Sequence, residues 1–213
     1  MVEYPADWNA KEFGDLGKIV GGGTPSTQVS SYWDGSINWF TPGEILETEK
    51  YSTNSKRTIT EAGLNNSPAK LLPVGAVLLT TRASIGLTSL LAVPAATNQG
   101  FQSVVVNEDN DREYVYYLIG VLKSEMQSRA SGSTFLEISP KQLKTIPVVV
   151  PPLPEQKRIA AVLSNADKLI ANVEKRIAKK RAIKQGAMQE LLRKVQGESG
   201  SLGYFETRGY LKL

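Results

Sequence analysis

The segment Pro151-Pro-Leu-Pro-Glu-Gln-Lys-Arg-Ile159 and the run that follows it decide how the chain is organised. Pro154 suits the first position of a helix, where its missing N–H costs nothing. Glu155 then lies in the first turn, where a carboxylate interacts favourably with the helix dipole. We therefore predict one helix from Pro154 to Val195, about 42 residues and roughly 60 Å long.

Apolar side chains recur along this predicted helix with a seven-residue period. The first, fourth and fifth positions of a frame that starts at Ile159 are mostly apolar, with interruptions at Lys180 and Lys184. Such a stripe is typical of a coiled coil with another long helix, and packing of the helix on its own domain is the alternative. Gly186 costs about 1 kcal/mol relative to Ala inside a helix, so a kink there is an open alternative to a straight run. The residues predicted to form the seam are Ile159, Val162, Leu163, Ala166, Leu169, Ile170, Val173, Ile177, Ile183 and Leu191.

The sequence before the long helix predicts a mixed α/β domain of short strands and few helices. Together with the single long helix that follows, this gives an α+β fold. We place this domain at residues 1–150, the long helix at 151–196 and a C-terminal tail at 197–213. Tyr32–Gly35 is expected to be a turn, and residues 47–66 an irregular polar surface segment. Apolar runs and turn residues predict strands at 37–41, 74–82, 87–93, 101–106 and 146–150. A short helix is predicted at 139–143.

A further helix is expected from Asp111 to Arg129. Its apolar residues recur at helical spacing and therefore predict a face packed against the core. These residues are Val115, Leu118, Ile119, Leu122 and Met126.

The composition excludes several kinds of chemistry. The chain has 213 residues, no cysteine and no histidine. It therefore lacks the commonest general base, the commonest zinc ligand and any thiolate ligand, and we predict no metal site. The N-terminal sequence is not that of a signal peptide, and no apolar run is long enough to cross a membrane, so we expect a cytoplasmic protein. The net charge is +4, and the basic excess lies on the long helix.

Three loops carry residue types that suit contacts with nucleic acid. Gly21-Gly-Gly-Thr-Pro-Ser26 permits close backbone approach to a phosphate, although a plain tight loop is the alternative. Arg82-Ala-Ser-Ile-Gly86 places an arginine at a hairpin tip, and arginine can bond guanine O6 and N7. Asn98 and Gln99 can bond adenine bidentately. Trp33 and Trp39 are interpreted as core or loop anchors rather than base-stacking platforms.

These motifs, taken in order, resemble the specificity (S) subunits of type I restriction–modification systems. The resemblance ends with Pro151–Ala160, and it begins with Trp8, Leu16-Gly17, Gly22–Ser26, Tyr32–Gly35, Trp39 and Thr41-Pro-Gly43. No single piece is specific, but their order along roughly residues 5–195 is. Other matching pieces are Leu72-Pro73, Leu78-Leu79, Arg82–Gly86, Thr97–Phe101, Gly132–Phe135 and Ile138-Ser139.

The resemblance implies a non-catalytic protein that reads double-stranded DNA. A target recognition domain would read one half of a bipartite site, and the long helix would act as a spacer and dock the modification (methyltransferase) subunit. S-adenosylmethionine, ATP and Mg would be bound by the partner modification and restriction subunits, and this chain would bind no cofactor. The usual S subunit has two such domains and two helices, whereas this chain contains one of each, like half an S subunit. A twofold homodimer through the helix would then imply an interrupted palindromic target.

The residues predicted to contact DNA fall into two groups. Motif residues are Thr24, Ser26, Arg82, Ser84, Asn98, Gln99, Ser133 and Thr134. Residues shared by a family that reads many sequences can instead hold the fold, so the 47–70 segment is the better source of target-specific contacts. In that segment the predicted contacts are Lys50, Tyr51, Arg57 and Lys70.

Two other functions compete with this interpretation. The first is a scaffold whose coiled coil dimerises a globular domain that does not bind DNA. The second is an enzyme that acts through clustered carboxylates at Glu108, Asp109 and Asp111. Those carboxylates stand just before a predicted helix, where they are expected to cap and solvate its start.

Overall fold

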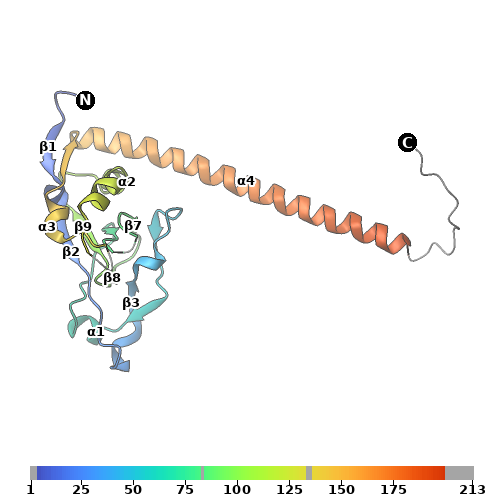
Figure 1. Cartoon of the computed structure of the whole chain (residues 1–213), viewed down its shortest axis with the longest axis horizontal. Helices are drawn as coiled ribbons and strands as arrows, with labels where there is room; N and C mark the ends of the chain where they lie inside the picture. Colours follow the sequence, from blue (N-terminus) through green and yellow to red (C-terminus); the bar gives the residue numbers. More distant parts are fainter. Residues whose placement is uncertain (1–3, 83, 133–135, 200–213) are drawn as a thin grey trace. The chain divides into compact units, whose positions relative to one another are not determined.

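The structure, a computed structural model, describes residues 4–82, 84–132 and 136–199. The chain divides after Leu163 into two compact units (Figure 1). The first contains the sheets and short helices and the start of the long helix, and the second continues that helix. The α+β prediction is confirmed, with several small sheets followed by one long C-terminal helix.

The first unit is built from short strands, as the sequence predicts. Its strands are β1 (Asn9–Glu12), β2 (Gly17–Gly21), β3 (Trp33–Phe40), β4 (Tyr51–Ser52), β5 (Arg57–Ile59), β6 (Val77–Leu79), β7 (Thr88–Leu91), β8 (Ala95–Thr97), β9 (Gln102–Val106) and β10 (Pro147–Val150). Its helices are α1 (Glu61–Asn65), α2 (Arg112–Arg129) and α3 (Pro140–Lys144), with 3-10 turns at Phe13–Leu16, Ser30–Tyr32 and Pro42–Glu44.

The described strands form three sheets that connect distant parts of the sequence. A five-stranded sheet has the order β2-β9-β6-β7-β4, and a three-stranded sheet has the order β5-β3-β8. The strand β1 near the N-terminus pairs antiparallel with β10, which leads into the long helix. Most pairs are antiparallel, but β3–β8 and β4–β7 are parallel.

The helix α2 covers the largest core cluster, as its apolar spacing predicts. Val115, Ile119 and Met126 are fully buried there, and Leu118 and Leu122 pack at its edge. The sheet residues Val77, Leu79, Leu90 and Val104 belong to the same cluster. Asp111 caps the helix, since its Oδ1 accepts a hydrogen bond from Tyr114 N at 2.9 Å.

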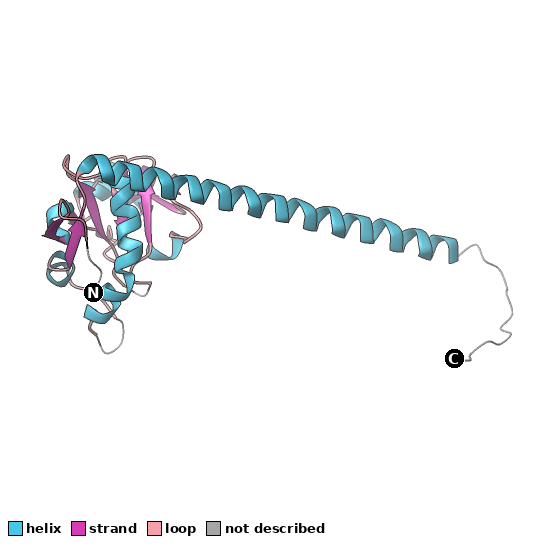
Figure 2. Cartoon of the chain, turned by 90° about the horizontal axis from the view of Figure 1, so that it is seen from above, coloured by secondary structure: helices cyan, strands magenta, loops and turns pink. Residues whose placement is uncertain are grey.

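The long helix α4 (Leu153–Ser199) begins one residue before the predicted start and runs through Gly186 without interruption (Figure 2). Ile159 and Ala160, in its first turns, pack into the core of the first unit. None of the described helices combines the length and apolar character needed to cross a membrane.

Two local predictions were wrong. Tyr32–Gly35 is not a simple turn, because Trp33 already begins β3. The strand register shifts between Trp33 and Ile37, and Asp34 takes a positive φ of 59°. Asp-Gly sequences are common in turns because Asp tolerates such a backbone conformation, and here the conformation occurs within an irregular strand. The 47–66 segment is not irregular throughout, since β4, β5 and α1 lie in it. Hydrogen bonds from Ser55 to Asn38 Oδ1 help to fix its path.

Replacing Ile119 with alanine tests the packing of α2. Ile119 is fully buried, so Ile119→Ala should lower the free energy of unfolding of the first unit by about 2–5 kcal/mol. Val121→Ala on the same helix is the control, because Val121 is 79% exposed and its loss should change stability by no more than about 0.5 kcal/mol. Urea unfolding followed by tryptophan fluorescence measures both, and equal effects would contradict the placement of α2.

Candidate functional site

The glycine-rich loop before β3 lies directly against the loop after β8. Gly23 N donates to Thr97 O at 2.8 Å, and Gly23 O accepts from Trp39 Nε1 at 2.9 Å. A Cβ on Gly22 would lie 2.0 Å from Asn98 O, and a Cβ on Gly23 would lie 2.4 Å from Ala69 N. Glycine is therefore needed at position 22 for the two loops to meet, and at position 23 for close approach to the segment Pro68-Ala69.

Three of the predicted contact residues meet where these loops touch. Thr24 Oγ1 donates to Gln99 Oε1 at 2.6 Å, and Gln99 is exposed. Asn98 uses its own groups locally, since its N donates to Phe40 O at 3.0 Å and its Oδ1 accepts from Gly100 N at 2.9 Å. Asn98 therefore shapes the loop, while Thr24 and Gln99 form a polar pair at its surface.

The arginine hairpin joins the same group of loops. Thr81 N donates to Gly100 O at 2.8 Å, which places Arg82 next to the loop that carries Gln99. Arg82 Nε lies 2.8 Å from Glu137 Oε2, an ion pair without the alignment of a hydrogen bond. Ser84 is exposed, and its carbonyl accepts from Thr80 Oγ1. The predicted residues Ser133 and Thr134 lie outside the described part of the chain.

Arg57 is held against a tryptophan face. Its guanidinium carbon lies 3.6 Å from the centroid of the Trp33 ring, and Arg57 itself is exposed. Trp33 is fixed in turn, because its Nε1 donates to Ser26 O at 3.1 Å and its ring meets Trp39 edge-on at 5.1 Å. Stacking on an aromatic face fixes the guanidinium plane and leaves its N–H edge available to a partner.

Lys70 and Ser26 lie beside the same tryptophan cluster. Ala69 is buried with Trp33, Trp39 and Ile59, and Lys70 follows it as an exposed residue. The side chain of Ser26 is exposed, and its carbonyl anchors Trp33. Within the part of the chain that the structure describes, neither Arg57 nor Lys70 makes an ion pair. Arg57 thus contacts the tryptophan cluster directly, and Lys70 and Thr24 follow residues that pack on it or bond to it.

Lys50 and Tyr51 lie elsewhere and have partners on α2. Lys50 Nζ donates to Glu113 Oε2 at 2.9 Å and to Tyr117 OH at 3.0 Å, and its side chain is 13% exposed. Burial alone would lower the pKa of Lys50, but the hydrogen bonds to Glu113 and Tyr117 outweigh it and raise the pKa above its ordinary value. Tyr51 OH donates to Glu113 Oε1 at 2.9 Å, and burial and this bond raise its pKa. Lys50 and Tyr51 therefore attach the 47–66 segment to α2.

A second ion pair ties the same segment to α2. Lys123 Nζ lies 2.5 Å from Glu47 Oε1, and the hydrogen bond from Lys123 lowers the pKa of the Glu47 carboxyl. Glu113, Tyr117 and Lys123 were not singled out from the sequence. More than sixty residues separate them from their partners, and no local pattern signals such a pairing.

The acidic residues Glu108, Asp109 and Asp111 stand just before α2. Asp111 is the cap of α2, as predicted. Among the described residues, no group of three or more His, Cys, Asp or Glu side chains is placed to hold a metal ion. The loops around Trp33 and Trp39 offer hydrogen-bonding groups and positive charge.

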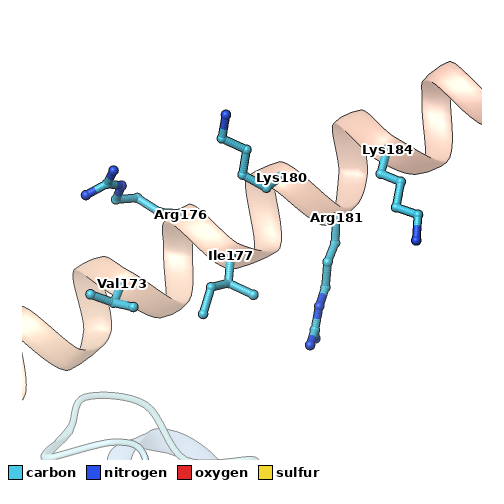
Figure 3. A pocket seen from close by; sticks show the side chains of 6 residues that line it. All are labelled: Val173, Arg176, Ile177, Lys180, Arg181 and Lys184. Carbon is cyan, nitrogen blue, oxygen red and sulfur yellow. The ribbon is translucent and has the colours of Figure 1, made fainter.

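The second unit presents apolar and basic side chains from one helix. Val173 and Ile177 are about half exposed, at 52% and 46%, and they point to one side of α4 (Figure 3). Arg181 points to the same side, whereas Arg176 and Lys180 point away from it (Figure 3). Ile159 is partly buried and packs against the core of the first unit. The other predicted seam residues of α4 with large side chains are exposed, namely Val162, Leu163, Leu169, Ile170, Ile183 and Leu191. Ala166 is exposed as well.

Comparison with known proteins identifies the class to which this arrangement belongs. Residues 5–180 match the family described as the type I restriction modification DNA specificity domain. The chain therefore belongs to this family, and the resemblance seen in the sequence motifs is confirmed.

The relatives within the family are specificity subunits. The chain is 37% identical over 176 residues to the type I restriction enzyme MjaIX specificity subunit of Methanocaldococcus jannaschii, which covers 81% of this chain and 41% of the relative. It is 30% identical to the EcoR124I/EcoR124II specificity subunit of Escherichia coli, over 86% of this chain and 46% of the relative. The chain thus spans less than half the length of these relatives.

Solved structures share the fold. One chain, from a study of the assembly and conformational transition of the type I R-M system, matches with a TM-score of 0.73 at 22% identity. That match covers 91% of this chain and 46% of the other. The HsdS subunit from Thermoanaerobacter tengcongensis matches with a TM-score of 0.64 at 20% identity, over 82% of this chain and 40% of that one.

Alanine at Arg57 or Lys70 tests the tryptophan cluster as a DNA-binding surface. Arg57→Ala should weaken binding to a target duplex by about 1–3 kcal/mol if the guanidinium contacts a base. Lys70→Ala should weaken it less and reduce the slope of log K against log salt by about 1, as expected for one phosphate contact. Fluorescence anisotropy at several salt concentrations measures both effects.

The matched control is Lys141→Ala, which removes an exposed lysine from α3. It should leave the affinity for DNA unchanged, and all three variants should keep the oligomeric state of the parent. If Arg57→Ala and Lys70→Ala both leave the DNA affinity within error, the DNA-binding face lies elsewhere on the chain.

Proposed function

We propose that this chain is the DNA-reading specificity component of a type I restriction–modification complex. The observation that carries the proposal is the family match over residues 5–180, which includes every loop that meets around Trp33 and Trp39. The family is described by DNA specificity, and its members named above are specificity subunits. A scaffold that does not bind DNA receives no support from these relatives.

Recognition would divide between residues that build the surface and residues that read DNA. The glycine loop and Asn98 hold the loops together, so they position the surface. Arg57 offers a guanidinium already fixed on Trp33, which suits a bidentate contact with guanine O6 and N7. Lys70 suits a phosphate, and the Thr24–Gln99 pair offers donors and acceptors to a base edge.

The chain would direct chemistry that its partners perform. We infer that methyl transfer and cleavage belong to modification and restriction subunits, which would bind S-adenosylmethionine, ATP and Mg. The chain itself would be non-catalytic and would bind no cofactor, and the complex would act in the cytoplasm. The lack of histidine and cysteine in the sequence is compatible with this division.

The exposed stripe of α4 would be the seam of a homodimer. Leu169 is 67% exposed and Ile170 is 58% exposed. Complete burial of such a side chain stabilises the associated state by roughly 1.5–3 kcal/mol. A second copy of the helix supplies a matching stripe, and a closed antiparallel pair gives twofold symmetry. The basic side of α4 would then face the modification subunit, and the dimer would read an interrupted palindrome.

Methylome sequencing tests the proposed function directly. Cells that carry this chain and its cognate modification subunit should methylate a symmetric, interrupted motif, because two identical reading units would bind its two halves. Cells without the chain are the control and should lack that motif. An asymmetric motif would require a second, different specificity chain and would exclude the homodimer, and no motif at all would contradict the proposed function.

Single cysteines along α4 test the direction of the seam. The chain has no native cysteine, so Val162→Cys, Leu169→Cys, Val173→Cys, Ile177→Cys and Ile183→Cys each introduce one thiol. A disulfide requires Cα atoms about 4.4–6.8 Å apart. An antiparallel seam should therefore crosslink identical chains only near the twofold axis, whereas a parallel seam should crosslink them at most stripe positions.

Non-reducing electrophoresis after mild oxidation reads out the crosslinks. Gln185→Cys is the control, because this exposed residue lies on the side of the heptad frame opposite the seam. In an antiparallel dimer, positions far from the axis should crosslink only when two different variants are mixed. A protein that stays monomeric and crosslinks at none of these positions would exclude the seam.

A further inference from the structure

Gln156, in the first turn of α4, occupies a core position with a polar side chain. It is 1% exposed, whereas its neighbours Lys157 and Arg158 are exposed. Its Oε1 accepts a hydrogen bond from Asp111 N at 2.9 Å. Its Nε2 donates to Pro151 O at 2.9 Å and to Asn110 Oδ1 at 3.1 Å. Both amide hydrogens and the carbonyl oxygen of the side chain thus have partners.

The network continues from Gln156 through the loop between β9 and α2. Asn110 is 7% exposed, and its Nδ2 donates to Asn107 Oδ1 at 2.7 Å. Asn107 then donates from Nδ2 to Asp15 O at 2.9 Å and from its backbone N to Leu16 O at 3.1 Å. A chain of three side-chain amides therefore links the start of α4 to the start of α2 and to the 3-10 turn before β2. All of these residues belong to the first unit.

The network restrains α4 in a way that apolar packing does not. Ile159 and Ala160 pack beside it in the core, and such contacts tolerate small rotations and shifts of a helix. Hydrogen bonds are directional, and a buried amide that loses its partners bears a large desolvation cost. Gln156 therefore permits one orientation of the first turn of α4 on the first unit.

We infer that Gln156 is a positioning residue that sets the distance between the two DNA half-sites. This inference rests on the proposed function, in which α4 is the spacer between two reading units. A helix is stiff, so a change of direction at its first turn grows along its length. A deviation of about 10° moves a point 30 residues farther on by roughly 8 Å, which is about two base-pair steps of DNA. Loosening this joint should therefore relax the selection of spacer length.

Gln156→Leu tests the inference, because leucine fills the core position and makes none of the three hydrogen bonds. The probes are duplexes that carry the two half-sites of the methylome motif with spacers shortened or lengthened by one and two base pairs. The complex with the parent chain should prefer one spacer by at least about tenfold, and the complex with Gln156→Leu should prefer it by less than about threefold. Affinity for a single half-site should be the same for both. Asn110→Ala, which removes one bond to Gln156, should give an intermediate spacer preference and serves if Gln156→Leu does not fold.

Gln185→Leu is the matched control, since it makes the same replacement at an exposed position of α4 and should keep the spacer preference of the parent. A folded Gln156→Leu or Asn110→Ala complex with the spacer preference of the parent would overturn the inference and leave the proposed function standing. A parent complex that binds all spacers equally would overturn this inference alone, and one that binds neither half-site would overturn the proposed function. Circular dichroism and half-site binding establish that each variant is folded.

Discussion

A helix as long as α4 cannot bury its own apolar stripe, and this constraint governs the organisation of the chain. The stripe starts at Ile159, which packs against the core of the first unit, and from Val162 to Leu192 its large apolar side chains are exposed. Exposed leucine and isoleucine at regular spacing over several heptads favour association, because burying each side chain lowers the free energy of the associated state. The interruption by Lys180 and Lys184 limits how far such an apolar seam extends. A second helix is the simplest surface with the matching periodicity.

The loops of the first unit depend on a different constraint, the close approach of backbone to backbone. Gly22 and Gly23 bring the loop before β3 against Asn98 and Ala69, where a side chain would not fit. This approach buries Trp39 and gives its indole N–H a partner at Gly23 O. The motif residues are therefore largely the framework of the surface. In the proposed function, residues outside the shared motifs, such as Arg57 and Lys70, would distinguish one DNA sequence from another.

In the proposed function, the framework residues would let one fold serve many DNA targets. Arg57 lies on the short strand β5, which pairs with β3, and its guanidinium stacks on the ring of Trp33. A different residue at this position would alter the chemistry presented without disturbing the glycine loop or the tryptophan pair. Lys50 differs from Arg57, because its charge is paired with Glu113. Its replacement would therefore loosen the attachment of β4 to α2.

The sequence by itself determined the elements whose signals are local. The apolar periodicity of α2 and α4, the caps at Asp111 and Ser139 and the order of the family motifs all follow from residues close together in the chain. The same reasoning missed the strands within 47–66 and the early start of β3, because short strands are stabilised by partners far away in sequence.

Only the tertiary structure decided which candidate residues share a surface. It brought Thr24 to Gln99, Arg57 to Trp33 and Lys50 to Glu113, and it revealed Gln156 as a buried link between α4 and α2. Contacts of this kind join residues separated by more than twenty positions. They depend on the paths of several loops at once, and the spacing of residues along a chain does not specify those paths.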